Sequence, residues 1–279
     1  MNAFKQLLQN PARGVDAHPR ASHQRVPLGT WVMSASPLVA EAIGHAGFDW
    51  AVLDMEHSPL ELPGVVQMLQ ALATTKLVPI VRLPANDAVL FKRLLDAGAS
   101  TLMVPFVQSA AEARRAVAAT RYPPLGLRGV AGMSRATRYG TLRLDTQAAD
   151  AGVALILQLE TPQALDALEE IAAVEGVDAL FIGPADLSAA MGHGGNARHP
   201  AVQKLVAQAA ERARAAGIPI GTLAGTPEMA TQVRAAGFDF VGLGSDLGLL
   251  VHAAQASLHA LRTPDAAAVH SLHVGTHAY

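Results

Sequence analysis

The amino-acid sequence predicts a single-domain (β/α)8 barrel of the TIM type. Three observations lead to this fold class: the chain has 279 residues, 51% of them are hydrophobic, and one helix–glycine–strand unit recurs along it. A chain of about 250 residues with a large apolar fraction can close one barrel around a buried core. The recurring unit is the pattern expected of parallel strands that alternate with helices.

Each unit is a helix that ends at a glycine and is followed by a short apolar strand. The glycines stand where the residue after a helix adopts a left-handed conformation. The strands are almost entirely apolar, as expected of parallel strands that are buried on both faces. Five segments contain the unit and three further apolar runs complete eight strands: 28–34, 45–54, 78–84, 96–105, 153–160, 174–184, 214–224 and 234–244.

Helix starts are predicted mainly by hydroxyl residues that precede a proline, because the hydroxyl can cap the helix and proline fits its first position. The predicted caps of this kind are Ser36, Ser58, Thr161 and Thr226. Ser109 with Glu112 forms a capping-box pattern, and Asn86 is predicted to cap the helix that follows it.

Eight strands that alternate with about eight helices are compatible with a closed barrel or with an open doubly wound sheet. The open sheet is poorly supported, because no glycine-rich turn of the GxGxxG type follows the first strand. We therefore predict one barrel domain over 26–262, an irregular N-terminal arm over 1–25 and a tail over 263–279. The long connection 106–152 carries a basic loop, which we expect over the barrel mouth.

The composition excludes several classes of protein. The chain has 21 Lys and Arg against 23 Asp and Glu and no basic run, so neither a nucleic-acid surface nor a membrane anchor is expected. It has no cysteine, which excludes disulfides and thiolate metal sites. No apolar run reaches the roughly 20 residues of a membrane span. We expect a soluble, cytoplasmic protein.

Polar side chains gather at the predicted carboxyl ends of the strands, where barrel enzymes place their chemistry. They are Asp54, Glu56, His57, Arg82, Gln158, Glu160 and Asp186. Glu160 and Asp186 follow adjacent strands, and two carboxylates with room for water suit Mg²⁺ or Mn²⁺. Each carboxylate alone could instead cap the helix that follows it.

The other polar residues also have two interpretations. His57 could transfer protons or be an ordinary strand-end histidine, and Asp54 lies on the same strand end as a further catalytic candidate. Arg82 could bind a carboxylate or keto oxygen, or simply pair with a buried acid. Asp96, at the end of the third helix, reads from sequence as a surface acid.

Several ordered blocks resemble the HpcH/HpaI aldolase family over roughly residues 27–255. The blocks are VLDMEHSP (52–59), VRLPANDAVLFKRLLDAGASTLMVPFVQSAAEAR (81–114), RYPPLGLRGV (121–130), LQLETPQAL (157–165), VEGVDALFIGPADLSAAMGHGGNARHPAVQ (174–203) and GSDLGLL (244–250). The most specific is GPADLS followed by MGHGGN. Met55 departs from the pattern, because the family usually has glycine there.

The resemblance implies a metal-dependent class II pyruvate aldolase. Such an enzyme reversibly cleaves a 4-hydroxy-2-oxo acid to pyruvate and an aldehyde. By matching position, Glu160 and Asp186 would be the ligands of Mg²⁺, Mn²⁺ or possibly Co²⁺, His57 the base and Arg82 the transition-state stabiliser. Asp96 would raise the basicity of the histidine across a subunit interface. A homo-hexamer is implied, with the C-terminal helix exchanged between subunits.

The candidate substrate contacts are Gln158, Gly183, Pro184, Ala185, Asp186 and Leu223, of which Gln158 and Ala185 match contact positions of the family. We expect the loop over 126–141 to recognise the aldehyde. The four lysines fall at helical or terminal positions, which argues against Schiff-base chemistry. The alternatives are a citrate-lyase-like or malyl-CoA-type lyase, and a barrel that binds oxo acids without catalysis.

Overall fold

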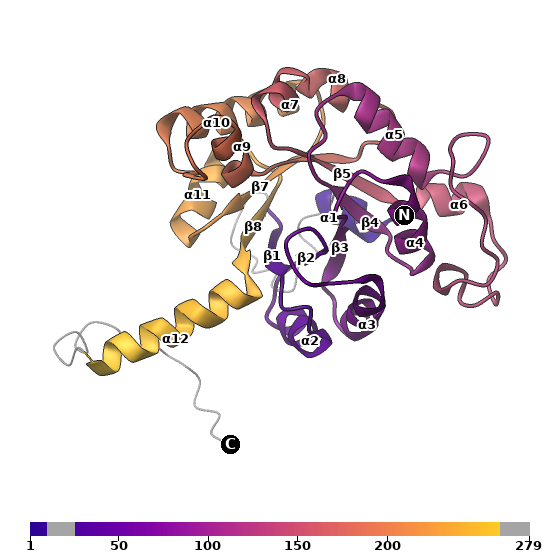
Figure 1. The fold of residues 1–279 in the computed structure, drawn as a ribbon, viewed down its shortest axis with the longest axis horizontal. Helices are drawn as coiled ribbons and strands as arrows, with labels where there is room; N and C mark the ends of the chain where they lie inside the picture. The colour runs from indigo at the N-terminus through magenta and orange to yellow at the C-terminus, as the bar shows by residue number, and fades with distance from the viewer. Residues whose placement is uncertain (10–25, 263–279) are drawn as a thin grey trace.

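The structure, a computed structural model, describes residues 1–9 and 26–262. Eight parallel strands pair in chain order, and β1 closes on β8 to form one barrel surrounded by helices (Figure 1). The predicted (β/α)8 fold is therefore confirmed. The strands are β1 Leu28–Val32, β2 Trp50–Asp54, β3 Val78–Arg82, β4 Thr101–Val104, β5 Ala154–Leu159, β6 Ala179–Ile182, β7 Ile220–Ala224 and β8 Phe240–Ser245.

The helices run back between successive strands, and three of the connections contain more than one helix. They are α1 Ala3–Gln9, α2 Pro37–His45, α3 Leu62–Leu72, α4 Ala88–Asp96, α5 Ala110–Thr120, the 3₁₀ helix η2 Arg135–Thr137, α6 Thr146–Ala151, α7 Pro162–Asp166, α8 Leu168–Ala172, α9 Pro184–Ala190, α10 Pro200–Ala215, α11 Pro227–Ala235 and α12 Asp246–Arg262. No helix in the described part of the chain is both long and apolar enough to cross a membrane.

Four predicted helix caps are confirmed and two are wrong. Ser36, Thr161, Thr226 and Ser109 each accept a backbone N–H at the start of a helix. Ser58 does not cap, because its hydroxyl donates to the carbonyl of Asp54 and α3 begins only at Leu62. Asn86 does not cap α4 either, because the cap is its neighbour Asp87, whose carboxylate accepts the Val89 N–H.

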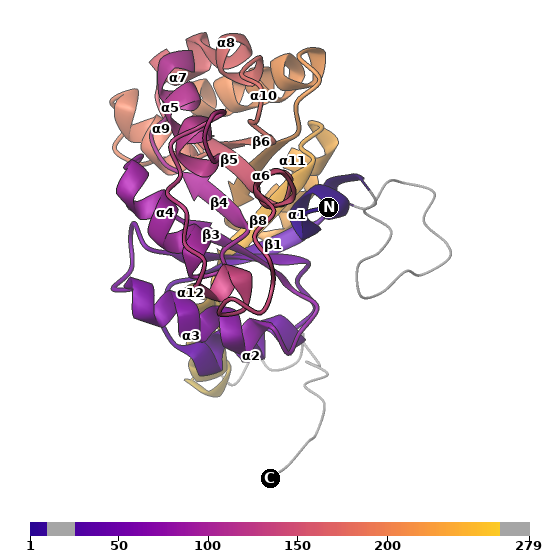
Figure 2. The same cartoon turned by 90° about the vertical axis from the view of Figure 1, so that its right-hand side faces the viewer.

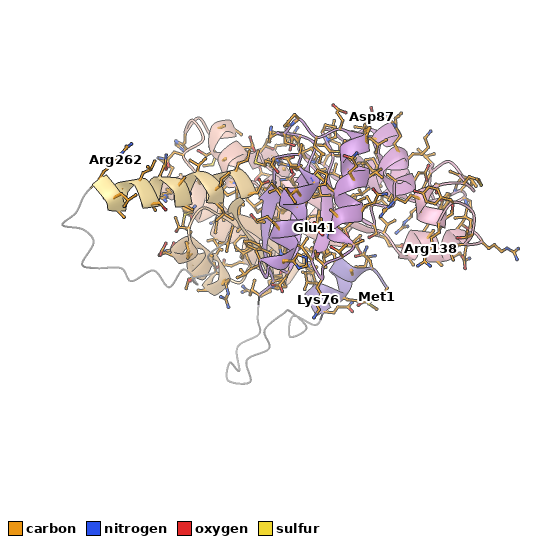
Figure 3. The ribbon with its side chains drawn as sticks, turned by 90° about the horizontal axis from the view of Figure 1, so that it is seen from below. Met1, Glu41, Lys76, Asp87, Arg138 and Arg262 are labelled. Carbon is orange, nitrogen blue, oxygen red and sulfur yellow. The ribbon has the colours of Figure 1, made fainter. Side chains whose placement is uncertain are left out.

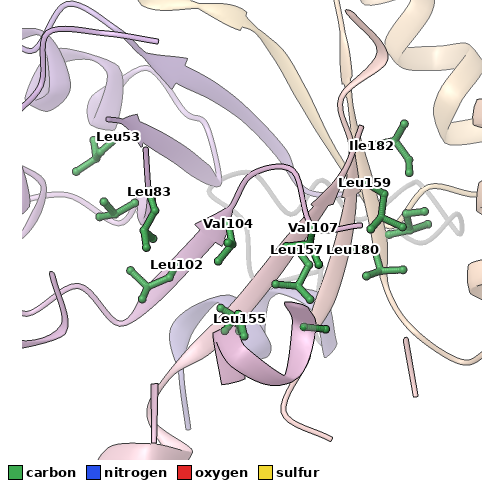
Figure 4. Packing of buried hydrophobic residues seen from close by; sticks show 14 of the residues in the cluster. Leu53, Leu83, Leu102, Val104, Val107, Leu155, Leu157, Leu159, Leu180 and Ile182 are labelled. Atoms are coloured by element: carbon green, nitrogen blue, oxygen red, sulfur yellow. The ribbon is translucent and has the colours of Figure 1, made fainter. Parts of the chain in front are cut away.

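The hydrophobic core has two layers. The outer layer lies between the strands and the helices and is built largely from aliphatic side chains such as Leu53, Leu102 and Leu157 (Figure 4). The inner layer fills the barrel and is more aromatic, with Trp50 and Phe240 in edge-to-face contact at a centroid distance of 5.7 Å. Strands buried on both faces explain why the sequence reads as continuous apolar runs.

A glycine makes room for the aromatic side chains inside the barrel. A Cβ atom at Gly29 of β1 would lie only 2.0 Å from the indole of Trp50. Any side chain at this position would force the ring or the strand to move, since barrel interiors are close-packed. The small residue is thus the counterpart of the large one on the neighbouring strand.

The first residues of the expected arm form the helix α1, which packs against one end of the barrel (Figure 2). Phe4 is completely buried and meets Phe240 edge-to-face at 5.2 Å. The Asn2 amide donates to the carbonyls of Ser100 and Gly152, which lie just before β4 and β5. α1 therefore closes the amino-terminal end of the barrel. The rest of the arm, 10–25, and the expected tail, 263–279, lie outside the described residues.

The basic loop expected over the barrel mouth lies at the opposite end. It follows the carboxyl end of α5, and Arg135 donates to the carbonyl of Ala97 just after α4. Helices of this barrel run antiparallel to the strands, so the carboxyl ends of α4 and α5 lie near the amino-terminal ends of the strands. The expectation was wrong because the loop follows a helix rather than a strand.

α12 leaves the barrel as a projecting helix (Figures 1 and 3). Only its first residue, Asp246, is buried. The carboxylate of Asp246 accepts the N–H groups of Met33 and Ser34, which fixes the start of the helix to the end of β1. Beyond that point the helix exposes several apolar side chains: Leu249, Leu250, Val251, Leu258 and Leu261.

Candidate active site

The strand-end residues named from the sequence meet at the carboxyl end of the barrel. Asp54 and Arg82 end β2 and β3 and are paired in register. Gln158 lies near the end of β5 and Glu160 directly follows it, while Asp186 lies in the first turn of α9 after β6. Because the strands are parallel, their carboxyl ends open on the same face.

Arg82 is the best-anchored side chain of the group, and it is almost completely buried. Its Nε and Nη2 donate to the two oxygens of Asp54 at 2.9 and 2.7 Å, which is a bidentate pair. Nη1 lies 2.9 Å from Glu56 Oε2, and the guanidinium carbon is 5.9 Å from the Trp31 ring centroid. Two of its five N–H groups are thereby hydrogen-bonded, and the Nη1 contact with Glu56 is an ion pair without a hydrogen bond, so donors remain for a substrate oxygen.

The bidentate pair also sets the charge of Asp54. Burial raises the pKa of this carboxyl, but the hydrogen bonds and positive charge of Arg82 outweigh burial and hold the pKa below its ordinary value. Asp54 additionally accepts the backbone N–H groups of Glu56 and His57. One carboxylate thus orients both the arginine and the turn that carries His57.

Glu160 is buried, with both carboxylate oxygens engaged. Oε2 accepts the backbone N–H of Phe106, and Oε1 accepts the side-chain amide of Gln158, each at 3.0 Å. A Cβ at Gly183 would lie 2.4 Å from Oε1, so only glycine leaves space for this carboxylate. Burial, reinforced by the negative charges of Glu56 and Asp186, raises the pKa of Glu160 to about 7.

The site carries more negative than positive charge. Burial also raises the pKa of Glu56, where the charges of Arg82 and His57 lower it and those of Asp54 and Asp186 raise it further. Arg82 is the only arginine or lysine among the described residues that contacts this group of acids. Carboxylates crowded in this way favour a bound cation, because a divalent ion supplies the missing positive charge.

The donor set fits a hard divalent cation held in part by other oxygens. Within residues 1–9 and 26–262, no three His, Asp or Glu side chains are grouped so as to hold a metal ion. A cation at Glu160 and Asp186 would therefore need water or substrate oxygens to complete its coordination. Mg²⁺ commonly binds in this manner, through one or two carboxylates.

His57 lies at the rim of the group, with about half of its side chain exposed. Its Nε2 is 3.7 Å from Glu56 Oε2, which in turn contacts Arg82. The ring is thus beside the acids yet open to a substrate. Asp96 is not brought to this place, because it ends α4 at the other end of the barrel and pairs with Arg128.

The predicted substrate contacts differ in exposure. Gln158 is buried with its Oε1 unpaired among the described residues, whereas Ala185 is exposed and Leu223 half-buried. Gly183 and Pro184 are buried where β6 passes into α9. Gln158 and Gly183 lie against the carboxylate of Glu160, so a small ligand there would meet both the acids and an amide oxygen.

Glu56 and Trp31 are the site residues to which the sequence assigned no role. Glu56 was listed among the polar strand-end residues but given no role, and no role was predicted for Trp31. The available signal for Glu56 was an acid two residues beyond a buried strand, between Asp54 and His57. The contact of Trp31 with Arg82 joins β1 to β3, which no local pattern in the sequence shows.

The comparisons with known proteins agree with this geometry. The model of the HpcH/HpaI aldolase/citrate lyase family matches residues 28–253. The chain belongs to this family. A 2-dehydro-3,6-dideoxy-6-sulfogluconate aldolase from Pseudomonas putida is 51% identical over 239 residues, which are 86% of this chain and 94% of that protein.

Two further members extend the comparison. A 5-keto-4-deoxy-D-glucarate aldolase from Citrobacter koseri is 44% identical over 232 residues, 83% of this chain and 90% of that protein. The crystal structure of a family protein from Burkholderia cenocepacia J2315 superimposes with a TM-score of 0.86 at 40% identity, covering 94% of this chain and all of that one. This member of the HpcH/HpaI family is an aldolase, a carbon–carbon lyase, which argues against the non-catalytic barrel.

Proposed function

We propose that this aldolase reversibly cleaves a 4-hydroxy-2-oxo acid to pyruvate and an aldehyde, and that it requires a divalent metal. The observation that carries the proposal is Arg82, which is fixed by Asp54 and Glu56 beside the buried carboxylate of Glu160. A fixed guanidinium next to a place for a cation suits a substrate that develops negative charge on one oxygen.

Glu160 and Asp186 would hold the metal, and Mg²⁺, Mn²⁺ or Co²⁺ would each suit carboxylate and water ligands. A bound divalent ion would supply Lewis-acid stabilisation of the charge that develops on the C2 oxygen of the substrate. The free N–H groups of Arg82 would donate to the same oxygen. Gln158, with its unpaired Oε1, and the turn at Gly183, Pro184 and Ala185 would orient the oxo acid, with Leu223 packed at its side.

His57 would accept the proton of the C4 hydroxyl. As this proton leaves, the bond between C3 and C4 breaks, the aldehyde departs, and the electron pair moves into the enolate of pyruvate. Return of one proton to C3 then gives pyruvate, and the reverse sequence forms the aldol. Asp54 would keep His57 in place by accepting its backbone N–H. A positioned acid–base group contributes about 10²–10⁴-fold to such a step.

We further propose that the active form is a homo-oligomer, a hexamer by resemblance, in which α12 packs on a neighbouring subunit and Asp96 acts on His57 of the partner subunit. The exposed apolar side chains of α12 support the first part. The position of Asp96 at the far end of its own barrel supports the second. The loop over 126–141 lies at that same end, so it could read the aldehyde only in a neighbouring subunit.

The substrate is proposed to be a deoxy oxo acid of the kind named for the two relatives. A screen of aldehydes with pyruvate at fixed Mg²⁺, followed by the same screen after chelation with EDTA, tests the function. We expect condensation with at least one polar aldehyde and its loss on chelation. Full activity in excess EDTA would contradict the proposed metal requirement, and a cytoplasmic location is checked separately by cell fractionation.

A further inference from the structure

Arg128 is a buried cation far from the acids of the barrel mouth. It lies in the segment between α5 and α6, which runs beside α4 (Figure 2), and only 4% of its side chain is exposed. A buried arginine is rare unless it is paired. Its partner is Asp96: Arg128 Nη2 lies 3.3 Å from Asp96 Oδ1. Nothing in the chemistry described so far requires this pair.

The guanidinium of Arg128 is held from several sides. The N–H groups of Leu127 and Arg128 donate to the carbonyls of Ala118 and Arg121, which ties the turn to the end of α5. The guanidinium carbon lies 4.5 Å from the centre of the Tyr122 ring, within cation–π range. Tyr122 is itself fixed to α6, because its N–H donates to the carboxylate of Asp150. The donor therefore has one well-defined position.

Asp96 occupies a position that would be unfavourable without this donor. It is the last residue of α4, and a carboxylate at the carboxyl end of a helix is repelled by the helix dipole. Its side chain remains 24% exposed, and among the described residues only Oδ1 accepts a hydrogen bond. Arg128 thus holds one oxygen of Asp96, and the other accepts no hydrogen bond among the described residues.

We infer that Arg128 is a positioning residue, which fixes Asp96 so that its free oxygen can reach the active site of a neighbouring copy of this chain. The inference rests on the proposed role of Asp96. Arg128 touches neither substrate nor metal in this arrangement and acts only through Asp96. The free Nε of Arg128, unpaired among the described residues, allows the pair to tighten into a two-point contact when the neighbour is bound.

The first test measures how far Arg128 and Asp96 act as one unit. R128M should lower kcat by about tenfold or more with little change in KM, because positioning errors act on the reacting geometry. R128K, which keeps the charge, should recover part of that loss. In a D96N background R128M should lower kcat by less than about twofold, because two residues that act through the same contact do not have additive effects. R121M, an arginine of the same segment that contacts Glu175, is the matched control and should keep its activity.

The second test asks whether Arg128 and Asp96 of one subunit act on His57 of another. Differently tagged H57A and R128M chains are co-expressed, and oligomers that carry both tags are purified. At each mixed interface the intact His57 of one chain meets the intact Asp96 and Arg128 of the other. Random pairing of equal amounts should therefore restore activity to about a quarter of the wild-type value. H57A with D96N should restore activity equally, whereas H57A with R82K, which disables the same site, should not.

The outcomes distinguish a failure of the inference for Arg128 from a failure of the proposed role of Asp96. Restoration by D96N but not by R128M would leave Asp96 in its role and overturn the inference for Arg128. If neither pair restores activity, or if a form that light scattering shows to be a monomer is fully active, the role of Asp96 is overturned and the inference with it. If R128M does not fold, as judged by circular dichroism, R128K replaces it and the same pattern is expected with smaller changes.

Discussion

At the scale of single residues, the geometry explains why the guanidinium of Arg82 is held so firmly. Asp54 accepts the two donors on one edge, Glu56 forms an ion pair with Nη1, and the centroid of the Trp31 ring lies 5.9 Å from the guanidinium carbon. A lysine could match the charge but not this set of directions, because its ammonium is a point donor on a flexible stem. The arrangement suits a group that must not move as charge develops on the substrate.

Arg82 and His57 should fail in different ways when they are replaced. R82K should slow both aldol cleavage and the exchange of pyruvate methyl protons by about 10²-fold, the scale for one lost preorganised donor. H57A should impair cleavage more than exchange, because pyruvate has no C4 hydroxyl. Deuterium incorporation at C3 by NMR, beside a coupled pyruvate assay, measures both. Wild-type exchange in R82K would show that Arg82 does not stabilise the enolate.

Gly183 should be required for metal binding although it offers no side chain. G183A would place a methyl group 2.4 Å from Glu160 Oε1, so the carboxylate has to move. We expect metal affinity to fall by about 10–100-fold, the range seen when the surroundings of a ligand are disturbed. The matched control is G225A, whose added Cβ would meet only Met229 Sδ at 3.9 Å. Equal affinities of the two variants by titration calorimetry would contradict this.

Metal binding should depend on pH through Glu160. Burial and the charges of Glu56 and Asp186 raise its pKa to about 7, so the metal-free protein binds a proton there below that pH. The ion needs the carboxylate, and affinity should therefore fall by about tenfold between pH 8 and pH 6. E56Q removes one of the negative charges and should move the decline to lower pH. A decline that stays in place in E56Q would assign it to another group.

At the scale of elements, local signals in the sequence predicted most helix starts. The prediction was wrong where a tertiary contact determines the start of a helix. Thr161 and Thr226 cap as expected because each hydroxyl accepts a backbone N–H in the first turn of the following helix. Ser58 has the same Ser-Pro signal, but its hydroxyl donates to the carbonyl of Asp54 and α3 begins only at Leu62. α1 gave no repeating signal, since its burial depends on the end of a barrel formed by distant strands.

Phe4 should be the residue through which α1 stabilises the barrel. F4A removes a completely buried ring that meets Phe240, and it should lower the free energy of unfolding by about 3 kcal/mol, the lower end for such truncations. K5A is the control on the same helix. It removes a partly exposed ion pair with Asp178 and should cost less than about 1 kcal/mol. Urea unfolding measures both, and equal losses would mean that Phe4 contributes no core packing.

At the scale of the whole molecule, the barrel could be predicted because its strands are short apolar runs that follow helix-ending glycines. Most of the site could be predicted from the barrel. Parallel strands in chain order place Asp54, Arg82 and Glu160 on one face without further information. The pairing of Arg128 with Asp96 could not be predicted, because it joins α4 to a loop 32 residues later. The same holds for the contact between Trp31 and Arg82, which depends on barrel curvature and not on any spacing.

α12 should determine the oligomeric state. A helix of 17 residues is about 25 Å long, and here it projects from the barrel with its apolar side chains exposed. L250D and L258D together should therefore dissociate the oligomer, since a charge is costly at an apolar interface. If Asp96 acts across that assembly, activity should fall with the mass measured by light scattering. Q255D, at an exposed polar position of the same helix, should change neither. An L250D/L258D double variant that keeps both mass and activity would show that α12 does not hold the subunits together.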